Sequence, residues 1–406
     1  MMAAAARGHW GGEVLPDEAY AAALLGLPAL WPARLAALLG IRRRGAGGGG
    51  GRRSARTAWD LVQRGRAAEV EAVRSMVTEA DPDAMAAHWA AAAGRVDVGL
   101  MWSAYRRLGV RVDVLGDAGY PAELGTHPAA PYVLFRSGAH PDLGGRTAAV
   151  VGTRRCTQAG RAIAAEFGGA LAAEGVRVVS GLALGIDGAA HQGALAVGGG
   201  APIGVVAGGV DRPYPVRHRT LWQQVSAVGT LVSAWPLGAR SEGWRFPARN
   251  KLIVALAEVV VVVESGERGG SMVTAQLATE QGVPVLAVPG SIRNPAAAGT
   301  NRLVRDGAAP ACGVEDVLDA LSLTAATSEA ADPRAAPSPS GAAALAAMGW
   351  DPVTTDTLAS RTGLEPAALA VLLAHLELDG WITGGAGRWQ RVGAADAGMP
   401  AFSRGG

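Results

Sequence analysis

The sequence predicts an α/β protein: a Rossmann-like, doubly wound parallel sheet with a small helical N-terminal domain and a C-terminal winged-helix domain. Three observations lead to this prediction. The middle of the chain holds six short β-branched runs that are apolar on both faces and are separated by segments of helical periodicity. The segment before them has helical spacing without a strand-like run. The segment after them contains two helices followed by a hairpin.

The N-terminal domain is expected to span residues 1–105. Within it, LLGLPALWPARLAALLG (24–40) is typical of two short helices joined by a tight turn, as in helix-hairpin-helix or SAM-like domains. Such a turn can hold a phosphate, but the second expected glycine is absent, so a packing hairpin is favoured. The next segment, IRRRGAGGGGGRRSAR (41–56), carries six arginines. It is either an accessory contact to an anion or a low-complexity insertion, and the insertion is favoured.

The core is expected to span residues 106–323. Its predicted strands are TAAVVGT (147–153), VRVVSG (176–181), APIGVVAGG (201–209), TLVSAW (230–235), EVVVVVE (258–264) and PVLAVPG (284–290). Strands that are apolar on both faces need helices above and below them. Segments such as 158–175 and 271–282 supply those helices.

The chain then changes composition. Residues 324–342 are expected to form a Pro/Ala/Ser linker, 343–394 a winged-helix domain and 395–406 a disordered tail. Winged helices often contact DNA with their second helix. Here that helix, 365–379, has three acidic residues and no Arg or Lys, and the domain has three Arg against five Asp and Glu. This charge suits binding to a protein, or packing on the core, better than binding to DNA.

Composition excludes several classes of protein. The chain has 406 residues, 49% hydrophobic and 18% charged, so it should fold. Its formal charge, 37 − 35 = +2, excludes a polybasic protein, and its two cysteines exclude a disulfide scaffold. The seven histidines are scattered, so no metal site is expected. Because neither a signal peptide nor a run long enough to span a membrane is visible, we expect a cytoplasmic protein with no membrane contact.

The ends of the six predicted strands point to an anionic ligand. They read GTRR (152–155), SGLALGID (180–187), GGVDRPYP (208–215), SAWPLG (233–238), ESGERGGS (264–271) and PGS (289–291). Glycine lets backbone amides approach a phosphate, although any single strand–helix turn needs glycine in any case. The first turn lacks GxGxxG, and the only lysine, Lys251, follows asparagine rather than glycine. Dinucleotide and P-loop sites are therefore excluded, and we expect no cofactor.

Charge favours a polymer over a small ligand. Residues 146–310 contain 16 Arg and Lys against 10 Asp and Glu. The cations at strand ends are Arg154, Arg155, Arg212, Arg217, Arg219, Arg240, Arg245, Arg249 and Lys251. A strip of this length matches repeated phosphates. Trp244 and Phe246 could stack an unpaired base, but Phe246 could equally fill the core, and Arg249 could instead pair with Glu242 or Glu264.

Seven blocks occur in order: GTRxCTxxG (152–160), SGLALGIDGAAHxGAL (180–195), VVAGGVDxxYP (205–215), FPARNKLIVAL (246–256), GGSMVTAxLAxExG (269–282), AVPG (287–290) and GTNxLVRDGA (299–308). Together they closely resemble the DNA-processing protein A family, DprA/Smf. The resemblance implies a homodimeric, non-enzymatic protein. It would bind and protect single-stranded DNA and help to load RecA recombinase, during natural transformation or in chromosomal repair.

The resemblance also implies a site. Arg154 corresponds to a phosphate contact, and Phe246 to Lys251 fall in the family's FPxRN block at the DNA pocket. Two positions depart from the family: Gly243 stands where a lysine is common, so Arg245 or Arg240 must replace it, and Lys251 stands where arginine is usual. The expected DNA-binding residues are Gly152, Thr153, Arg154, Ser180, Gly181, Arg217, Arg245, Phe246, Arg249, Asn250, Lys251, Gly270, Ser271 and Thr274.

Two other functions are weighed against this one. Nucleotide phosphoribohydrolases resemble this fold and use the glutamate of a PGGxGTxxE signature. Here the corresponding stretch, GGSMVTAQ, has Gln276 at that place and Glu280 one turn further on. Without a carboxylate there, an oxocarbenium-like transition state loses its stabiliser. A protein scaffold that no longer binds DNA is the third interpretation, and the presence of Arg154 and FPARNK disfavours it.

Overall fold

The computed structural model describes residues 9–10, 13–41, 52–76, 81–198, 200–322, 334–385 and 387–392. Most of the segments predicted as a Gly/Arg loop (41–56) and a linker (324–342), and the whole predicted tail, lie outside these residues. The chain forms two compact units. Unit 1 is Met1–Gly144 with Ile203–Leu256, and unit 2 is Gly145–Pro202 with Ala257–Gly406.

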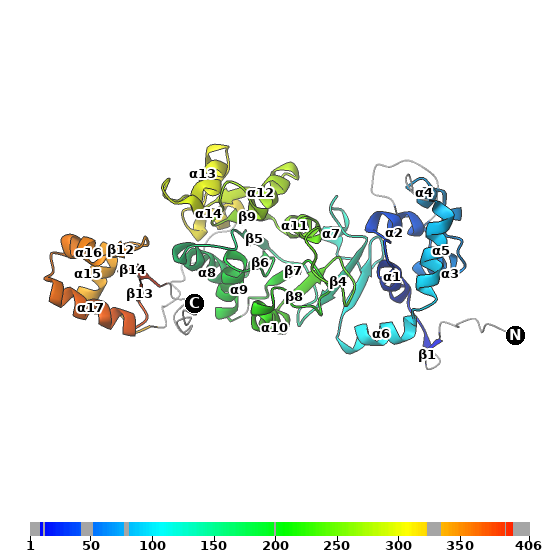
Figure 1. Ribbon diagram of the computed structural model, residues 1–406, viewed down its shortest axis with the longest axis horizontal. Coiled ribbons are helices and arrows are strands. Elements are labelled where there is room, and N and C mark those ends of the chain that lie inside the picture. Colours follow the sequence, from blue (N-terminus) through cyan, green and yellow to red (C-terminus); the bar gives the residue numbers. More distant parts are fainter. Residues whose placement is uncertain are drawn as a thin grey trace. The chain divides into compact units, whose positions relative to one another are not determined.

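Unit 1 begins with short helices (Figure 1). They are α1 (Asp17–Leu25), α2 (Pro32–Leu39), α3 (Ala55–Gln63), η1 (Ala67–Glu69), α4 (Glu71–Arg74), α5 (Pro82–Ala93) and α6 (Val98–Arg107). Ser54 and Asp97 cap α3 and α6 by accepting hydrogen bonds from Thr57 N and Leu100 N. The end of α1, the turn and α2 match the predicted hairpin. The predicted absence of strands is wrong at β1 (His9–Trp10) and β2 (Glu13–Val14), because two-residue strands are too short to leave a periodic pattern.

The rest of unit 1 is a four-stranded run in the order β7-β8-β4-β3. Its strands are β3 (Arg111–Val114), β4 (Val133–Ser137), β7 (Ile203–Val206) and β8 (Thr230–Ser233), and its helices are α7 (Ala122–Gly125), η2 (Val216–His218), α10 (Arg219–Val228) and α11 (Arg245–Ala255). β7 and β8 are parallel, as predicted, whereas β4 and β3 are antiparallel to their neighbours.

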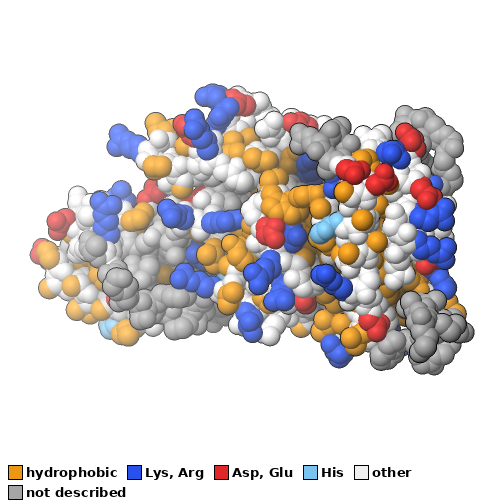
Figure 2. Space-filling model, turned by 45° about the vertical axis from the view of Figure 1, so that its right-hand side comes forward, with side chains coloured by type: hydrophobic (Ala, Val, Ile, Leu, Met, Phe, Trp, Pro, Cys, Tyr) orange, Lys and Arg blue, Asp and Glu red, His pale blue; other side chains and the backbone are white. Residues whose placement is uncertain are grey.

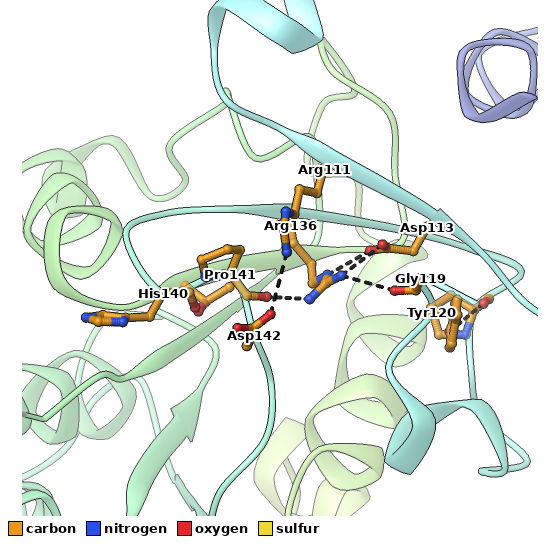
Figure 3. Close-up of polar contacts among 10 residues, drawn as sticks. Arg111, Asp113, Gly119, Tyr120, Arg136, His140, Pro141 and Asp142 are labelled. Atoms are coloured by element: carbon orange, nitrogen blue, oxygen red, sulfur yellow. Dashed lines mark hydrogen bonds and ion pairs between the residues drawn. The ribbon is translucent and has the colours of Figure 1, made fainter. Parts of the chain in front are cut away.

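The sequence did not predict β3 and β4, because each carries a charged residue that interrupts its apolar pattern. Asp113 and Arg136 are nevertheless buried, and they neutralise each other across the strand pair. Arg136 Nε and Nη2 donate to the two carboxylate oxygens of Asp113 at 2.7 and 2.8 Å. Further bonds from this guanidinium reach the carbonyls of Pro141 and Gly119 (Figure 3). The ion pair between the two strands therefore allows two charged side chains to be buried in the core.

Unit 2 contains a five-stranded parallel run in the order β11-β10-β9-β5-β6. The strands are β5 (Thr147–Val151), β6 (Arg177–Ser180), β9 (Val259–Val262), β10 (Val285–Ala287) and β11 (Ala309–Pro310). The helices are α8 (Gln158–Ala173), α9 (Ile186–Ala196), α12 (Gly270–Glu280), η3 (Pro295–Ala297), α13 (Ala298–Arg305) and α14 (Val314–Ala320). The chain winds outward in both directions from the β5/β9 boundary, so the predicted doubly wound fold is confirmed.

Both faces of these strands are buried. Alternate residues such as Val150, Val178 and Val261 pack with α8, α9 and α14, while the residues between them face the opposite side, which is also buried. Figure 1 shows α8 and α9 on one side of these strands and α12 and α13 on the other. α8 and α9 approach closely because Gly168 and Gly193 face each other's helix. A Cβ at Gly193 would lie 1.9 Å from the carbonyl oxygen of Ala165.

The C-terminal part of unit 2 is a small winged helix with its own core. It consists of α15 (Pro339–Met348), β12 (Val353–Thr354), α16 (Thr355–Thr362), α17 (Pro366–Leu378), β13 (Ile382–Gly385) and β14 (Arg388–Arg391). Leucines of α15, α16 and α17 fill the core, and the antiparallel order is β12-β14-β13. The predicted helices and hairpin are confirmed, and α15 starts earlier than the predicted boundary at 343. Within the described ranges, no helix combines the length and the apolar character that crossing a bilayer requires.

Candidate nucleic-acid interface

The loops that follow β5 and β6 pack directly on each other, and glycine makes this possible. Ile186 N donates to Thr153 O at 3.3 Å, and Thr153 N donates to Glu264 O at 2.7 Å. A Cβ at Gly152 would lie 2.5 Å from the side chain of Ile186, and Gly185 has a positive φ of 81°. Much of the glycine in these turns therefore serves loop packing. Arg154 is exposed at the tip of the first loop.

Glu264 fills the place where a nucleotide phosphate would be expected. In Rossmann folds the phosphate lies at the start of the helix that follows the first strand. Here the Glu264 carboxylate is buried and accepts from Thr157 N at 2.8 Å and from Thr157 Oγ1 at 2.6 Å. A Cβ at Gly160 would lie 2.4 Å from the same carboxylate. The first turn of α8 is therefore closed to an anion, which agrees with the missing dinucleotide fingerprint.

Three hydroxyls of the predicted site bond inside the protein. Ser180 Oγ donates to Val150 O at 2.6 Å, Ser271 Oγ to Ser265 Oγ at 2.8 Å, and Thr274 Oγ1 to Gly270 O at 3.0 Å. All three side chains are buried. Ser180 thereby joins β6 to β5, Ser271 bonds to the segment that follows β9, and Thr274 bonds within α12.

Two predicted glycines of unit 2 act through their backbone. Gly181 N donates to the Asp187 carboxylate at 3.1 Å. Gly270 opens α12, and the residue before it, Gly269, provides no side-chain cap. The start of a helix carries a partial positive charge that favours an anion. In unit 2, the features suited to a phosphate are therefore Arg154, Arg155 and the beginning of α12.

In unit 1, α11 carries most of the predicted contacts, with different degrees of burial. Arg249 and Asn250 are buried, whereas Lys251 is exposed. Arg249 Nη1 donates to Val205 O at 3.4 Å, and its guanidinium lies 5.7 Å from the centre of the Phe246 ring. Phe246 is half-buried and packs against Tyr214, with ring centroids 5.7 Å apart. Arg249 thus joins α11 to β7, while Lys251 faces solvent.

Arg245 was expected to replace the family's lysine, and its surroundings are aromatic. Its guanidinium lies 4.4 Å from the centre of the Trp235 ring and 4.9 Å from that of Trp244. Burial lowers the pKa of Arg245, and Glu242 partly offsets this. The other candidate, Arg240, provides its carbonyl as the acceptor of Arg245 Nη1 at 2.6 Å. Arg217, in η2, is exposed.

Sequence reasoning missed Trp31 and Trp235, which lie beside Trp244 in unit 1. Nothing in the sequence indicates that these rings lie together, because residues so far apart in the chain form no recognisable motif. On the face drawn in Figure 2, Lys and Arg side chains lie among apolar and some acidic side chains. Among the described residues, no group of three or more His, Cys, Asp or Glu is placed to hold a metal ion.

These features define a Rossmann-like α/β protein with a winged helix, in which the usual nucleotide position is closed and cations lie at strand ends. Residues 111–322 match the family model described as "DNA recombination-mediator protein A". Residues 328–388 match the model of the DprA winged helix domain. The chain belongs to this DprA/Smf family.

Known members are similar over much of their length. The chain is 38% identical to the putative DNA processing protein DprA of Mycobacterium tuberculosis over 284 residues, which is 66% of this chain and 71% of that protein. It is 35% identical to Protein Smf of Escherichia coli over 281 residues, 67% and 75% of the two chains. The crystal structure of DprA from Streptococcus pneumoniae superimposes with a TM-score of 0.60 at 27% identity and covers 75% of this chain and 98% of that one.

Proposed function

We propose that this protein binds single-stranded DNA through the strand-end loops of unit 2 and through α11 of unit 1, and acts as a recombination mediator. The observation that supports this most is the closed first turn of α8. Since Glu264 occupies the nucleotide position, we place the phosphates of the ligand at the exposed cations instead. Those cations, Arg154, Arg217 and Lys251, sit on separate elements, which suits a ligand with repeated phosphates.

The backbone of the strand is the expected ligand, with base stacking as a supplement. Phe246 and Tyr214 form a half-exposed aromatic pair, and stacking on such rings tolerates any base. We therefore expect binding without marked sequence preference. Family membership supports a DNA-processing role. Loading of RecA, homodimer formation, action in the cytoplasm and a role in natural transformation belong to the same proposal.

The alternative function, that of a nucleotide phosphoribohydrolase, requires a glutamate that this chain does not have at the corresponding position. Gln276 stands where a phosphoribohydrolase would have its glutamate, and its Nε2 donates to Glu280 Oε1 at 2.9 Å. Both side chains are exposed on α12. We therefore propose a binding protein rather than an enzyme. Incubation with AMP tests this directly, since release of free adenine would support the hydrolase instead.

The proposed function is tested by salt-dependent binding to dT oligonucleotides. Arg154→Ala and Lys251→Ala should weaken binding to all sequences alike, because phosphate contacts carry no base information. Each should also make the log–log salt slope less negative by about 0.7 per lost phosphate contact. Arg64→Ala, which removes an exposed arginine after α3, is the matched control and should leave both quantities unchanged. Equal behaviour of all three variants would reject the site.

The mediator role needs a separate measurement. A pull-down of the host RecA by the full chain, with and without single-stranded DNA, should show capture that increases when DNA is present. Failure to capture RecA under both conditions would restrict the function to DNA binding.

A further inference from the structure

Unit 1 contains a groove beside the start of α11, and of the described residues that line it, Arg245 is the one expected DNA contact. One wall is the turn of residues 26–31 between α1 and α2. The other is formed by residues 235–239 and Trp244 of the loop between β8 and α11, together with Arg245, the first residue of α11. The groove encloses about 420 Å³. It is therefore formed by two segments that are far apart in the sequence.

Tryptophan rings form the floor and the rim of this groove. The rings of Trp31 and Trp244 have centroids 4.9 Å apart, and these residues are 47% and 45% exposed. Trp235 is buried below them and meets Trp244 edge-on at 5.1 Å. Two exposed rings in contact form a small apolar patch, and such patches are a feature of sites for ligands and partners.

The charge of the groove favours an anionic occupant. Arg245 stacks on both Trp235 and Trp244, and its Nε is buried without a hydrogen-bond partner among the described residues. None of the described residues that line the groove is acidic. The neighbouring Glu242 carboxylate accepts from Trp244 Nε1 at 2.5 Å, which fixes the orientation of that ring.

Both walls are held in place by specific hydrogen bonds. On the turn, Trp89 Nε1 donates to Pro28 O at 3.0 Å and Arg34 Nη1 donates to Ala29 O at 2.9 Å. Ala29 itself has a φ of 55°, in the left-handed region that residues other than glycine rarely adopt. On the loop, Leu237 N donates to Tyr105 Oη at 3.0 Å. A groove formed in advance loses little conformational entropy when it binds.

We propose that this groove stacks one unpaired base of the single-stranded DNA, with Arg245 beside the adjoining phosphate. The inference rests on the proposed function and extends it, because Trp244 directly precedes α11, whose Phe246 and Lys251 are proposed DNA contacts. Aromatic faces and a guanidinium match the π-face and the phosphate of a nucleotide. The N-terminal turn thereby takes part in binding DNA.

The test compares Trp31→Ala with Trp31→Phe in the full chain, using dT oligonucleotides at fixed salt. Loss of one stacked base should weaken binding by about fivefold to a hundredfold in the alanine variant, whereas phenylalanine keeps a ring and most of the affinity. Trp350→Ala is the matched control, because Trp350 is also a half-exposed tryptophan with a stacked arginine, Arg391, but lies in the winged helix. It should bind like the unmodified chain.

Oligonucleotides with a single abasic site at successive positions complete the experiment. At one position the abasic site should weaken binding to the unmodified chain and have no effect on Trp31→Ala, because both changes remove the same stack. If Trp31→Ala binds normally while Arg154→Ala does not, the groove has another occupant, such as a peptide, and this inference is wrong although the proposed function stands. If the unmodified chain does not bind single-stranded DNA, both are wrong.

Discussion

The buried pair of Asp113 and Arg136 offers the sharpest test of how unit 1 is stabilised. Asp113→Ala would leave the Arg136 side chain, only 4% exposed, without the two bonds of 2.7 and 2.8 Å that Asp113 accepts. Removing one partner of a buried ion pair costs about 3–5 kcal/mol, because the remaining charge stays desolvated. With an m-value of about 3 kcal/mol/M, the urea midpoint should fall by roughly 1 to 2 M.

Tryptophan fluorescence during a urea titration measures this change. Eight of the eleven tryptophans belong to unit 1, so the signal reports mainly on the unit that contains the pair. Glu69→Ala is the matched control, because Arg66 and Glu69 have the same two-bond geometry, at 2.7 and 2.7 Å, but lie on the surface. Its midpoint should not move measurably.

A double replacement separates charge burial from packing. Asp113→Leu combined with Arg136→Met should recover most of the lost free energy of unfolding, since apolar groups of similar volume need no partner. If Asp113→Ala loses no more stability than Glu69→Ala, the reasoning from burial is refuted.

Three further outcomes are expected. In α8, burial and the nearby Glu315 raise the pKa of Glu166 above its ordinary 4.5. The protonated Glu166 side chain therefore stabilises the folded state fully below pH 4.5, and this stabilisation is lost as the pH rises through the pKa of the folded state. Glu166→Gln should therefore increase the free energy of unfolding at pH 7 but not at pH 4, and equal effects at both would contradict this. Gly193→Ala should lower stability by about 1–3 kcal/mol in thermal melts, because a Cβ would meet α8, whereas Gly198→Ala, with open space around it, should not. Ending the chain before residue 334 should change single-strand affinity by only a few fold, since α17 has no Arg or Lys, and a hundredfold loss would refute that view.

The predicted strands show what local pattern can reveal. Runs such as 147–153 and 258–264 are apolar on both faces, and only strands covered on both sides of a sheet need that pattern. The winged helix could also be predicted from local pattern, since Thr354 and Pro366 mark the starts of its two predicted helices. The strands β3 and β4 were missed because a charge interrupts each of them.

The candidate site shows what local pattern cannot reveal. The resemblance implied that Ser180, Ser271 and Thr274 were DNA contacts, and only the structure shows that each hydroxyl has a hydrogen-bond partner inside the fold. Whether a hydroxyl faces a ligand or a neighbouring strand depends on which segments meet. That information is absent from the local sequence.

The sequence by itself therefore determined the doubly wound sheet, the winged helix, the lack of a dinucleotide fingerprint and the cations at strand ends, because each follows from local spacing or local charge. Only the tertiary structure decided that Glu264 closes the start of α8, that Arg249 is buried while Lys251 is exposed, and that Trp31 lies against Trp244. These are contacts between segments distant in the chain. They depend on how whole elements pack, and no local pattern encodes them.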